Sequence, residues 1–281
     1  MSISTDFNEQ AKGSIRVASP WIEWLARLGF IAKGVVYALI GVLAIQVAFG
    51  GGAAPGTEDA FQTIAAQPFG QILLGLVAFG LVGYAIWLLV RAGMDTDNQG
   101  SDAEGIIKRL GYAIDGVIHM GLAFYAVTLL VSGLASSGGE SSMAEWTAWL
   151  MAQPFGRWLV GLGGAIGIGV GLYKLYKAYS TEFTEVLNLS QMSQTEREWT
   201  IRLGRAGIAA QGIVFAIIGG FFVQAAWQYQ PSEARGLGGA LQSLADQPYG
   251  PWLLTLVALG LVAHGIYMMF IVSQYRRINV A

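Results

Sequence analysis

The chain has 281 residues, of which 54% are hydrophobic and only 12% are charged. Because an average soluble domain carries about 25% charged residues, this composition argues against an ordinary water-soluble enzyme. The chain contains no cysteine, which excludes disulfides, thiolate nucleophiles, iron–sulfur clusters and zinc–thiolate sites. A net charge of -2 gives no basic surface for nucleic acid.

Six apolar runs of about 20 residues are each long enough to cross a bilayer as a helix. In chain order they are Phe30 to Phe49, Phe69 to Val90, Gly111 to Leu134, Gly156 to Tyr176, Ala206 to Trp227 and Trp252 to Ser273. The sequence therefore predicts an all-α, polytopic membrane protein.

Lysine and arginine are divided unequally between the two sides of the predicted membrane. Fourteen of the sixteen are assigned to the side that holds the C-terminal tail and the segments before the first, third and fifth spans, and the opposite loops hold only Arg157 and Arg235. Short loops rich in positive charge stay in the cytoplasm, so both termini are expected there. The N-terminus does not show the pattern of a removable signal peptide, and the first span is expected to act as the insertion signal.

A unit of two spans occurs three times in the sequence. Each unit opens with Arg-x-Gly-x-x-x-x-Gly followed by two aliphatic residues, and this motif starts at Arg27, Arg109 and Arg205. Later in each unit comes Gln-Pro-aromatic-Gly. Because each unit crosses twice, all three share one orientation, which predicts pseudo-threefold symmetry about the membrane normal. The expected organisation is an N-terminal segment with an interfacial helix (1–28), repeat 1 (27–95), repeat 2 (101–180), a cytoplasmic connection (181–204) and repeat 3 (205–277).

This pair of motifs, present three times over six spans, resembles a bacterial membrane family catalogued as domain of unknown function 1206. The resemblance covers about residues 24 to 277. It implies a three-repeat, six-helix protein of the bacterial cytoplasmic (inner) membrane. It brings no catalytic residues with it.

Small residues recur at helical spacing within the spans, where they let helix backbones approach closely in lipid. They include Gly34, Gly116 and Gly212 in the odd-numbered spans and Gly163, Gly167 and Gly171 in the fourth. We interpret them as helix-packing positions rather than as a phosphate loop, which needs a preceding strand and a water-exposed helix start.

Several further elements are predicted outside the spans. Helix starts are expected at Ser19-Pro20, at Ser101 to Glu104 and at Ser193 to Glu196. Short amphipathic helices are expected on the outer rim at Ala60 to Ala66, Ala144 to Ala152 and Gly239 to Asp246.

The Gln-Pro-aromatic-Gly element has two interpretations. Proline suits the first turn of a helix and an aromatic residue anchors at the membrane interface, and we favour this structural interpretation. In the alternative, the three glutamines form the rim of an outer opening around the axis; they are Gln67, Gln153 and Gln247.

Ionisable groups at membrane depth are expensive and therefore candidates for function. One repeat position holds Lys33, Asp115 and Gln211, and the position one helical turn deeper holds Tyr37, His119 and Phe215. With threefold packing these six side chains would form two stacked rings near the axis. We weigh a buried Lys33–Asp115 ion pair that fixes helix order against a polar site for a proton, an ion or a small anionic ligand.

His264 has a depth similar to that of His119, and two histidines on different spans could hold a b-type haem. A lone membrane histidine more often hydrogen-bonds between helices, so no cofactor is expected and haem is the lesser alternative. No metal site is expected either.

We rank a ligand-binding or transport bundle with a central polar site first, narrowly ahead of a structural or partner-binding subunit. The cytoplasmic segment 178–201 is the candidate surface for a protein partner, with a solvated linker as the simpler interpretation. An enzyme is not expected, because no catalytic constellation appears. The spans also lack a proline near their middle, which favours a static binder or narrow pore over alternating access.

Overall fold

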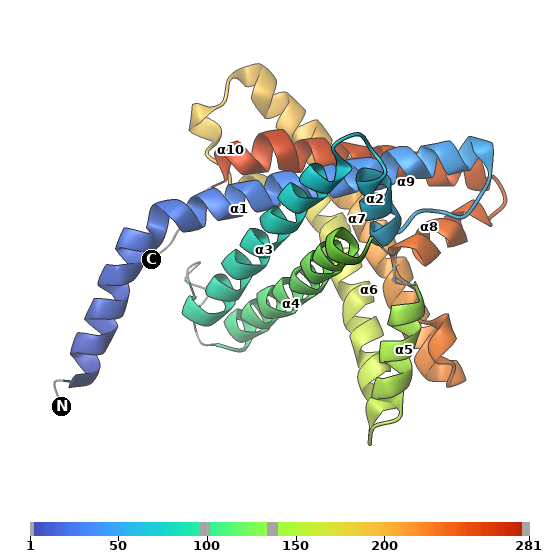
Figure 1. Cartoon of the computed structure of the whole chain (residues 1–281), viewed down its shortest axis with the longest axis horizontal. Coiled ribbons are helices and arrows are strands. Elements are labelled where there is room, and N and C mark those ends of the chain that lie inside the picture. The colour runs from blue at the N-terminus through green and yellow to red at the C-terminus, as the bar shows by residue number, and fades with distance from the viewer. Residues whose placement is uncertain (1–2, 96–99, 101, 134–139, 277–281) are drawn as a thin grey trace.

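The computed structural model describes residues 3–95, 100, 102–133 and 140–276. Within these ranges the chain is helical and contains no β-strand. The α-helices (Figure 1) are α1 (Ile3–Gly50), α2 (Thr57–Ala65), α3 (Gly70–Met94), α4 (Ala103–Ser132), α5 (Glu140–Met151), α6 (Gly156–Ser180), α7 (Gln194–Gln228), α8 (Leu237–Ala245), α9 (Gly250–Ile266) and α10 (Ser273–Tyr275). A π-helical turn, η4 (Tyr267–Val272), joins α9 to α10, and the shorter helices are η1 (Glu182–Thr184), η2 (Leu189–Gln191) and η3 (Pro231–Glu233).

Six segments are long and apolar enough to cross a membrane, as the sequence predicts. They are Glu23–Gly50, Gly70–Met94, Gly105–Ser132, Gly156–Ser180, Gln194–Gln228 and Gly250–Tyr275. Leu134, the expected end of the third span, lies outside the described residues. The predictions of an all-α fold and of six membrane-capable helices are confirmed.

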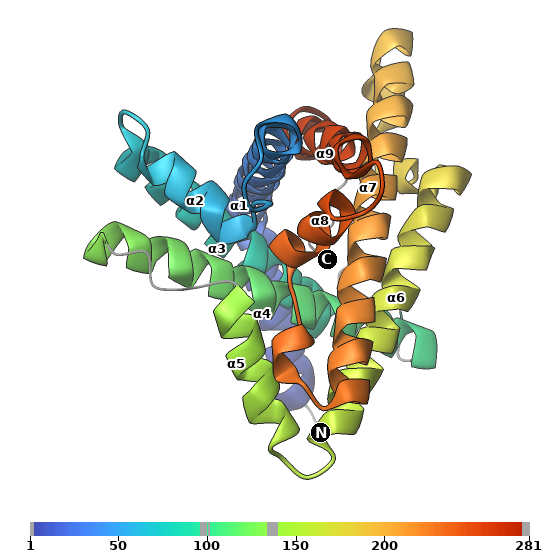
Figure 2. The same cartoon turned by 90° about the vertical axis from the view of Figure 1, so that its right-hand side faces the viewer.

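The six spans pack most closely as three pairs, each joining the second span of one repeat to the first span of the next. The pairs are α3 with α4, α6 with α7 and, closing the circle, α9 with α1. Figures 1 and 2 agree that the pairs run in different directions instead of standing parallel to one another.

One glycine of each first span makes the same contact within its pair. A Cβ built on Gly34, Gly212 or Gly116 would lie 2.7, 2.8 or 3.3 Å from a carbonyl oxygen of the partner helix. These carbonyls belong to Gly265, Gly171 and Ala85, which occupy the same repeat position. The repeated glycine is therefore required by close backbone approach, the usual means of helix packing in lipid.

The arginine that opens each repeat caps the C-terminal end of the same partner helix. Arg109 donates to the carbonyl oxygens of Ala92 and Gly93 at the end of α3, at 2.8 and 3.0 Å. Equivalent bonds link Arg27 to the carbonyls of Ser273 and Gln274, and Arg205 to that of Tyr179. A cation at a helix C-terminus satisfies free carbonyls and complements the helix dipole. The arginine and the glycine of the motif therefore both act on the same helix pair.

The glycine run of α6 packs differently from the prediction. Gly167 and Gly171 face α7, but a Cβ on Gly163 would meet no atom of another described helix within 4 Å. Its neighbour Gly164 makes the contact, with a Cβ position 2.7 Å from the carbonyl oxygen of Gly219. Adjacent residues point about 100° apart around a helix, so the packing role predicted for Gly163 is wrong.

The two spans of the middle repeat are separated. α1 packs on α3 and α7 packs on α9, whereas α4 and α6 make almost no contact with each other. The most apolar windows of α4 and α6 are only 28% and 17% buried, against 50% or more for α1, α3 and α9. The middle repeat therefore departs from the packing of the other two and leaves much of its surface facing the surroundings.

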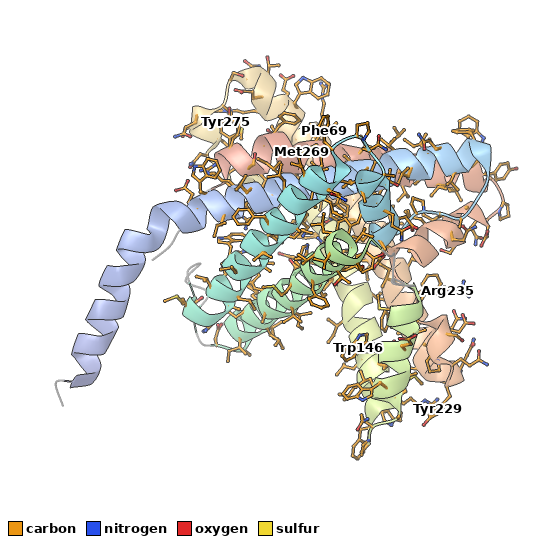
Figure 3. All side chains as sticks on the ribbon, viewed as in Figure 1. Phe69, Trp146, Tyr229, Arg235, Met269 and Tyr275 are labelled. Atoms are coloured by element: carbon orange, nitrogen blue, oxygen red, sulfur yellow. The ribbon has the colours of Figure 1, made fainter. Side chains whose placement is uncertain are left out.

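The Gln-Pro-aromatic-Gly element is a tight turn between a short outer helix and the following span. The span begins at the glycine, so the proline lies before the helix and the prediction that it occupies the first helical turn is wrong. The aromatic residue adopts a left-handed conformation, with φ between 61° and 63° at Phe69, Phe155 and Tyr249. Phe69 is labelled in Figure 3, and all three aromatic side chains are exposed.

Helix starts agree with the sequence in part. Ser193 and Glu196 form the predicted capping box of α7. Ser101 lies outside the described residues, and the cap of α4 is Asp102, which accepts from the amide of Gly105 at 3.1 Å. No helix begins at Ser19-Pro20, because α1 runs through this position. A proline removes one backbone bond and kinks a helix, and Figure 1 shows α1 bent in its N-terminal part.

The connection between α6 and α7 folds back onto the bundle. Phe183, Leu187 and Met192 are buried in one apolar cluster. The amide of Asn188 donates to the carbonyl oxygen of Tyr275 at 2.8 Å, and the Tyr275 hydroxyl donates to Glu196 at 2.9 Å. Tyr275 is labelled beside this segment in Figure 3. The interpretation as a merely solvated linker is therefore wrong, since the segment ties the last span to α7.

We predict that Gly156→Ala lowers the free energy of unfolding by roughly 1 to 3 kcal/mol, the usual cost of overpacking. A Cβ at this position would lie 1.7 Å from the carbonyl oxygen of Leu150. The matched control is Gly163→Ala in the same helix, which meets open space and should be neutral or slightly stabilising. Thermal unfolding in detergent, followed by circular dichroism, measures both. Equal effects of the two substitutions would contradict the requirement for glycine in the turn.

Candidate functional site

A cavity of about 470 Å³ lies where the three helix pairs meet. Its walls come chiefly from α1, α4, α6 and α7, and its far end is formed by residues of the short outer helices, including Phe61 of α2 and Leu237 of α8. All six residues of the two predicted rings line it, namely Lys33, Tyr37, Asp115, His119, Gln211 and Phe215. The structure thus brings together side chains from three different repeats around one space.

Lys33 is the buried cation of this cavity. It is 9% exposed, and its position on α1 follows directly from the packing of the adjacent Gly34 on α9. Its ammonium group donates to the hydroxyl of Tyr84 at 3.3 Å and lies 4.6 Å from the centre of the same ring. The distance from Lys33 Nζ to Asp115 Oδ2 is 3.9 Å, longer than the 2.7–2.9 Å of a direct charge-assisted hydrogen bond.

Asp115 and His119 lie one turn apart on α4, as the sequence spacing requires. His119 Nδ1 is 3.1 Å from Asp115 Oδ1 and 2.8 Å from the Asp115 carbonyl oxygen. The His119 ring packs edge-on against Tyr84, with 4.8 Å between ring centres. The Asp115 side chain remains 40% exposed, whereas those of Lys33 and His119 are nearly buried. The carboxylate is therefore held at the cavity surface.

Lys174 of α6 is a cavity residue that sequence reasoning missed. Its ammonium group donates to Gln211 Oε1 at 2.9 Å and lies 5.2 Å from the centre of the Phe215 ring. The sequence placed it among the basic residues at the cytoplasmic ends of the spans. A signal was present, because Lys174 follows Val170 by one turn and Val170 holds the repeat position of Tyr84 and His264.

The polar groups gather at one end of the cavity. We call Lys33, Asp115, His119, Lys174 and Gln211 the polar cluster; the remaining wall is mainly aliphatic and aromatic. The cluster contains two lysines and one carboxylate. In a low-dielectric surrounding an unbalanced charge is costly, so the cluster favours the entry of a negatively charged group.

His264 does not line the cavity. It is 1% exposed and its ring packs edge-on against Tyr37, with 5.1 Å between ring centres. Neither ring nitrogen has a hydrogen-bond partner among the described residues. His119 lines the cavity and His264 does not, so the two imidazoles do not face one common space there. The described residues also contain no cluster of three or more metal-binding side chains.

The three glutamines of the predicted outer rim do not line the cavity. Each side-chain amide donates to a backbone carbonyl one turn earlier in the preceding short helix, and each glutamine is exposed. The bonds are Gln67 to Thr63 at 3.3 Å, Gln153 to Trp149 at 3.3 Å and Gln247 to Ser243 at 3.1 Å. This geometry supports a capping role at the end of each outer helix.

We predict that replacing Gln67, Gln153 and Gln247 together with alanine lowers stability by at most about 1 kcal/mol per site, the net value of one exposed hydrogen bond. Thermal unfolding measures this loss. Because none of the three lines the cavity, leakage of small solutes from proteoliposomes should not change. A changed leakage rate at unaltered stability would favour the outer opening instead.

Comparisons with known proteins agree with the repeat pattern. The family described as "Domain of Unknown Function (DUF1206)" matches three segments, residues 28–95, 110–181 and 206–271. The chain is also similar to "Uncharacterized protein YxxB" of Bacillus subtilis (strain 168), with 36% identity over 248 residues that cover 88% of this chain and 89% of the relative. No solved structure matches. The three matched segments and this similarity over nearly the whole length show that the chain belongs to the DUF1206 family.

Proposed function

We propose that this protein is a membrane-embedded binding protein whose cavity receives the anionic group of a ligand between Lys33 and Lys174. The observation that carries the proposal is the composition of the polar cluster, with two lysines and one carboxylate around an open space at membrane depth. Each ammonium group has three donors. Lys33 and Lys174 each have one hydrogen-bond acceptor among the described side chains, which leaves donors for a ligand.

The helix-order interpretation accounts for only part of this arrangement. A Lys33–Asp115 pair at 3.9 Å can fix the position of α4 relative to α1. It does not explain why Lys174 lies in the same cavity or why the space between the charged groups is unfilled. Ligand binding explains both, because an anion would balance the second lysine.

The residues of the polar cluster have distinct roles in this proposal. Lys33 and Lys174 bind the anionic group. Gln211 positions Lys174 through its 2.9 Å hydrogen bond, and Asp115 positions Lys33 and His119 while preventing the site from carrying two uncompensated charges. No reaction is proposed, since the cluster offers charge and hydrogen bonds without an activated nucleophile.

The unequal distribution of basic residues supports a location in the bacterial inner membrane with both termini in the cytoplasm. The polar cluster then opens nearer the cytoplasmic face, because Lys174 precedes the end of α6 and Asp115 follows the start of α4. The absence of proline near the middle of the spans favours binding over alternating access.

We predict that native mass spectrometry of the gently solubilised protein shows a reproducible added mass. Lys33→Gln and Lys174→Gln should each weaken its retention about tenfold, as expected for the loss of one charge-assisted contact. The matched control is Lys177→Gln, because Lys177 is on the same helix but does not line the cavity. It should retain the mass.

Two outcomes would contradict the proposal. A bare chain in the spectrum, with no thermal stabilisation by phosphate or acetate, would exclude the anion site. The second outcome is that Lys33→Gln fails to fold, that the double variant Lys33→Asp with Asp115→Lys folds again, and that Lys174→Gln binds as before. These results would assign the charges to helix order alone.

A further inference from the structure

We infer that the ligand is an anionic lipid, with a carboxylate or phosphate head and an acyl chain, and that it enters the cavity sideways from the bilayer between α4 and α6. This inference rests on the proposed function and adds the class of ligand and its route. It follows from three properties of the cavity: where its wall is missing, how polarity changes along it, and what surrounds the missing wall.

The wall is missing between the two spans of the middle repeat. Every other pair of neighbouring spans is packed: α1 on α3, α3 on α4, α6 on α7, α7 on α9 and α9 on α1. α4 and α6 make almost no contact, yet both contribute residues to the cavity lining. Figure 2 shows these two helices running in different directions. We call the space between them the lateral gap.

The residues beside the lateral gap are apolar and exposed. On α4 they are Ile114 and Ile118, which are 53% and 54% exposed; on α6 they are Ile166 and Val170, which are 58% and 38% exposed. Aliphatic side chains of this exposure on a membrane-spanning helix contact lipid acyl chains. The cavity is thus continuous with the part of the protein surface that lipid covers.

Polarity changes along the cavity in the direction expected for a lipid molecule. On α6, Lys174 lies near the end of the helix that faces the cytoplasm in the proposed topology. Val170 and Ile166 follow towards the membrane centre, about 6 and 12 Å from Lys174 at 1.5 Å per residue. On α4, Asp115 and His119 are followed by Leu122, which lies farther from the cytoplasmic end of that helix in the proposed topology. A lipid of the cytoplasmic leaflet has the same order, with its charged head outward and its chain inward.

The opposite end of the cavity favours a chain over a second charged group. Its lining there includes Phe61 of α2 and Leu237 of α8, and the cavity volume of about 470 Å³ is within the range of sites for small ligands. A soluble anion would fill only the polar cluster. An acyl chain would also cover the apolar wall, and the lateral gap would let the rest of a longer molecule remain in the bilayer.

The first experiment needs no variant. Wild-type protein is placed in nanodiscs of phosphatidylcholine that contain a minority of either phosphatidylglycerol or oleate, and native mass spectrometry measures which lipid stays bound after release into detergent. We expect at least about tenfold preference for an anionic species over phosphatidylcholine with the same chains. The bound mass distinguishes a phospholipid from a free fatty acid. Equal retention of phosphatidylcholine would overturn the inference.

The second experiment tests the route. Ile118→Trp and Ile166→Trp place a large ring in the lateral gap and should reduce retained lipid about tenfold, equivalent to about 1.4 kcal/mol. The matched controls are Val117→Trp and Leu162→Trp, which lie on the same two helices, are 65% and 58% exposed and do not line the cavity. Thermal unfolding verifies that all four variants fold.

The two proposals fail separately. Stabilisation of the wild-type protein by phosphate or acetate, without any retained acyl lipid, would overturn the lipid inference and leave the anion site in place. Equal lipid retention in the gap variants and the controls would overturn the lateral route. Loss of the lipid in Lys33→Gln and Lys174→Gln as well as in the gap variants is the expected result for both.

Discussion

Close approach of backbones at one glycine of each repeat is the contact on which this bundle depends. In lipid, apolar burial provides little drive between helices, so association needs short distances and satisfied polar groups. The repeat supplies both, because the glycine meets a partner carbonyl and the arginine seven residues earlier caps the end of the same partner. Three such pairs form in three directions, and the cavity is the space that remains where they meet.

The middle repeat shows how one motif can serve two purposes. α4 and α6 each keep the glycine contact with a neighbouring repeat, but they do not pack on each other. The same position in the three first spans holds Lys33, Asp115 and Gln211. Because the three first spans pack through the same glycine contact, their three different side chains lie around one cavity. Because α4 and α6 do not pack on each other, that cavity is accessible from one side.

Much of the site was predictable because it follows the repeat. Aligning the three units groups the six ring residues, and helical spacing places Asp115 beside His119. What escaped prediction depends on helix phase and on contacts between repeats. Gly164 instead of Gly163 faces α7, since one residue changes the face of a helix. From the sequence Lys174 is expected at the membrane interface, and only the packing of α6 on α7 shows that it bonds to Gln211. Nothing in the residues of α4 or α6 predicts that these two helices are separated.

The pairing of α9 with α1 has a consequence for how the protein is made. Of the six spans, α1 is synthesised first, and its partner α9 follows after the other four. Gly34 and Gly41, which meet the carbonyls of Gly265 and Ala258 in the finished bundle, must wait in the bilayer while four other spans are inserted. The α3–α4 and α6–α7 pairs can form in order as they emerge. Insertion of α9 is therefore the step that completes the third helix pair beside the cavity.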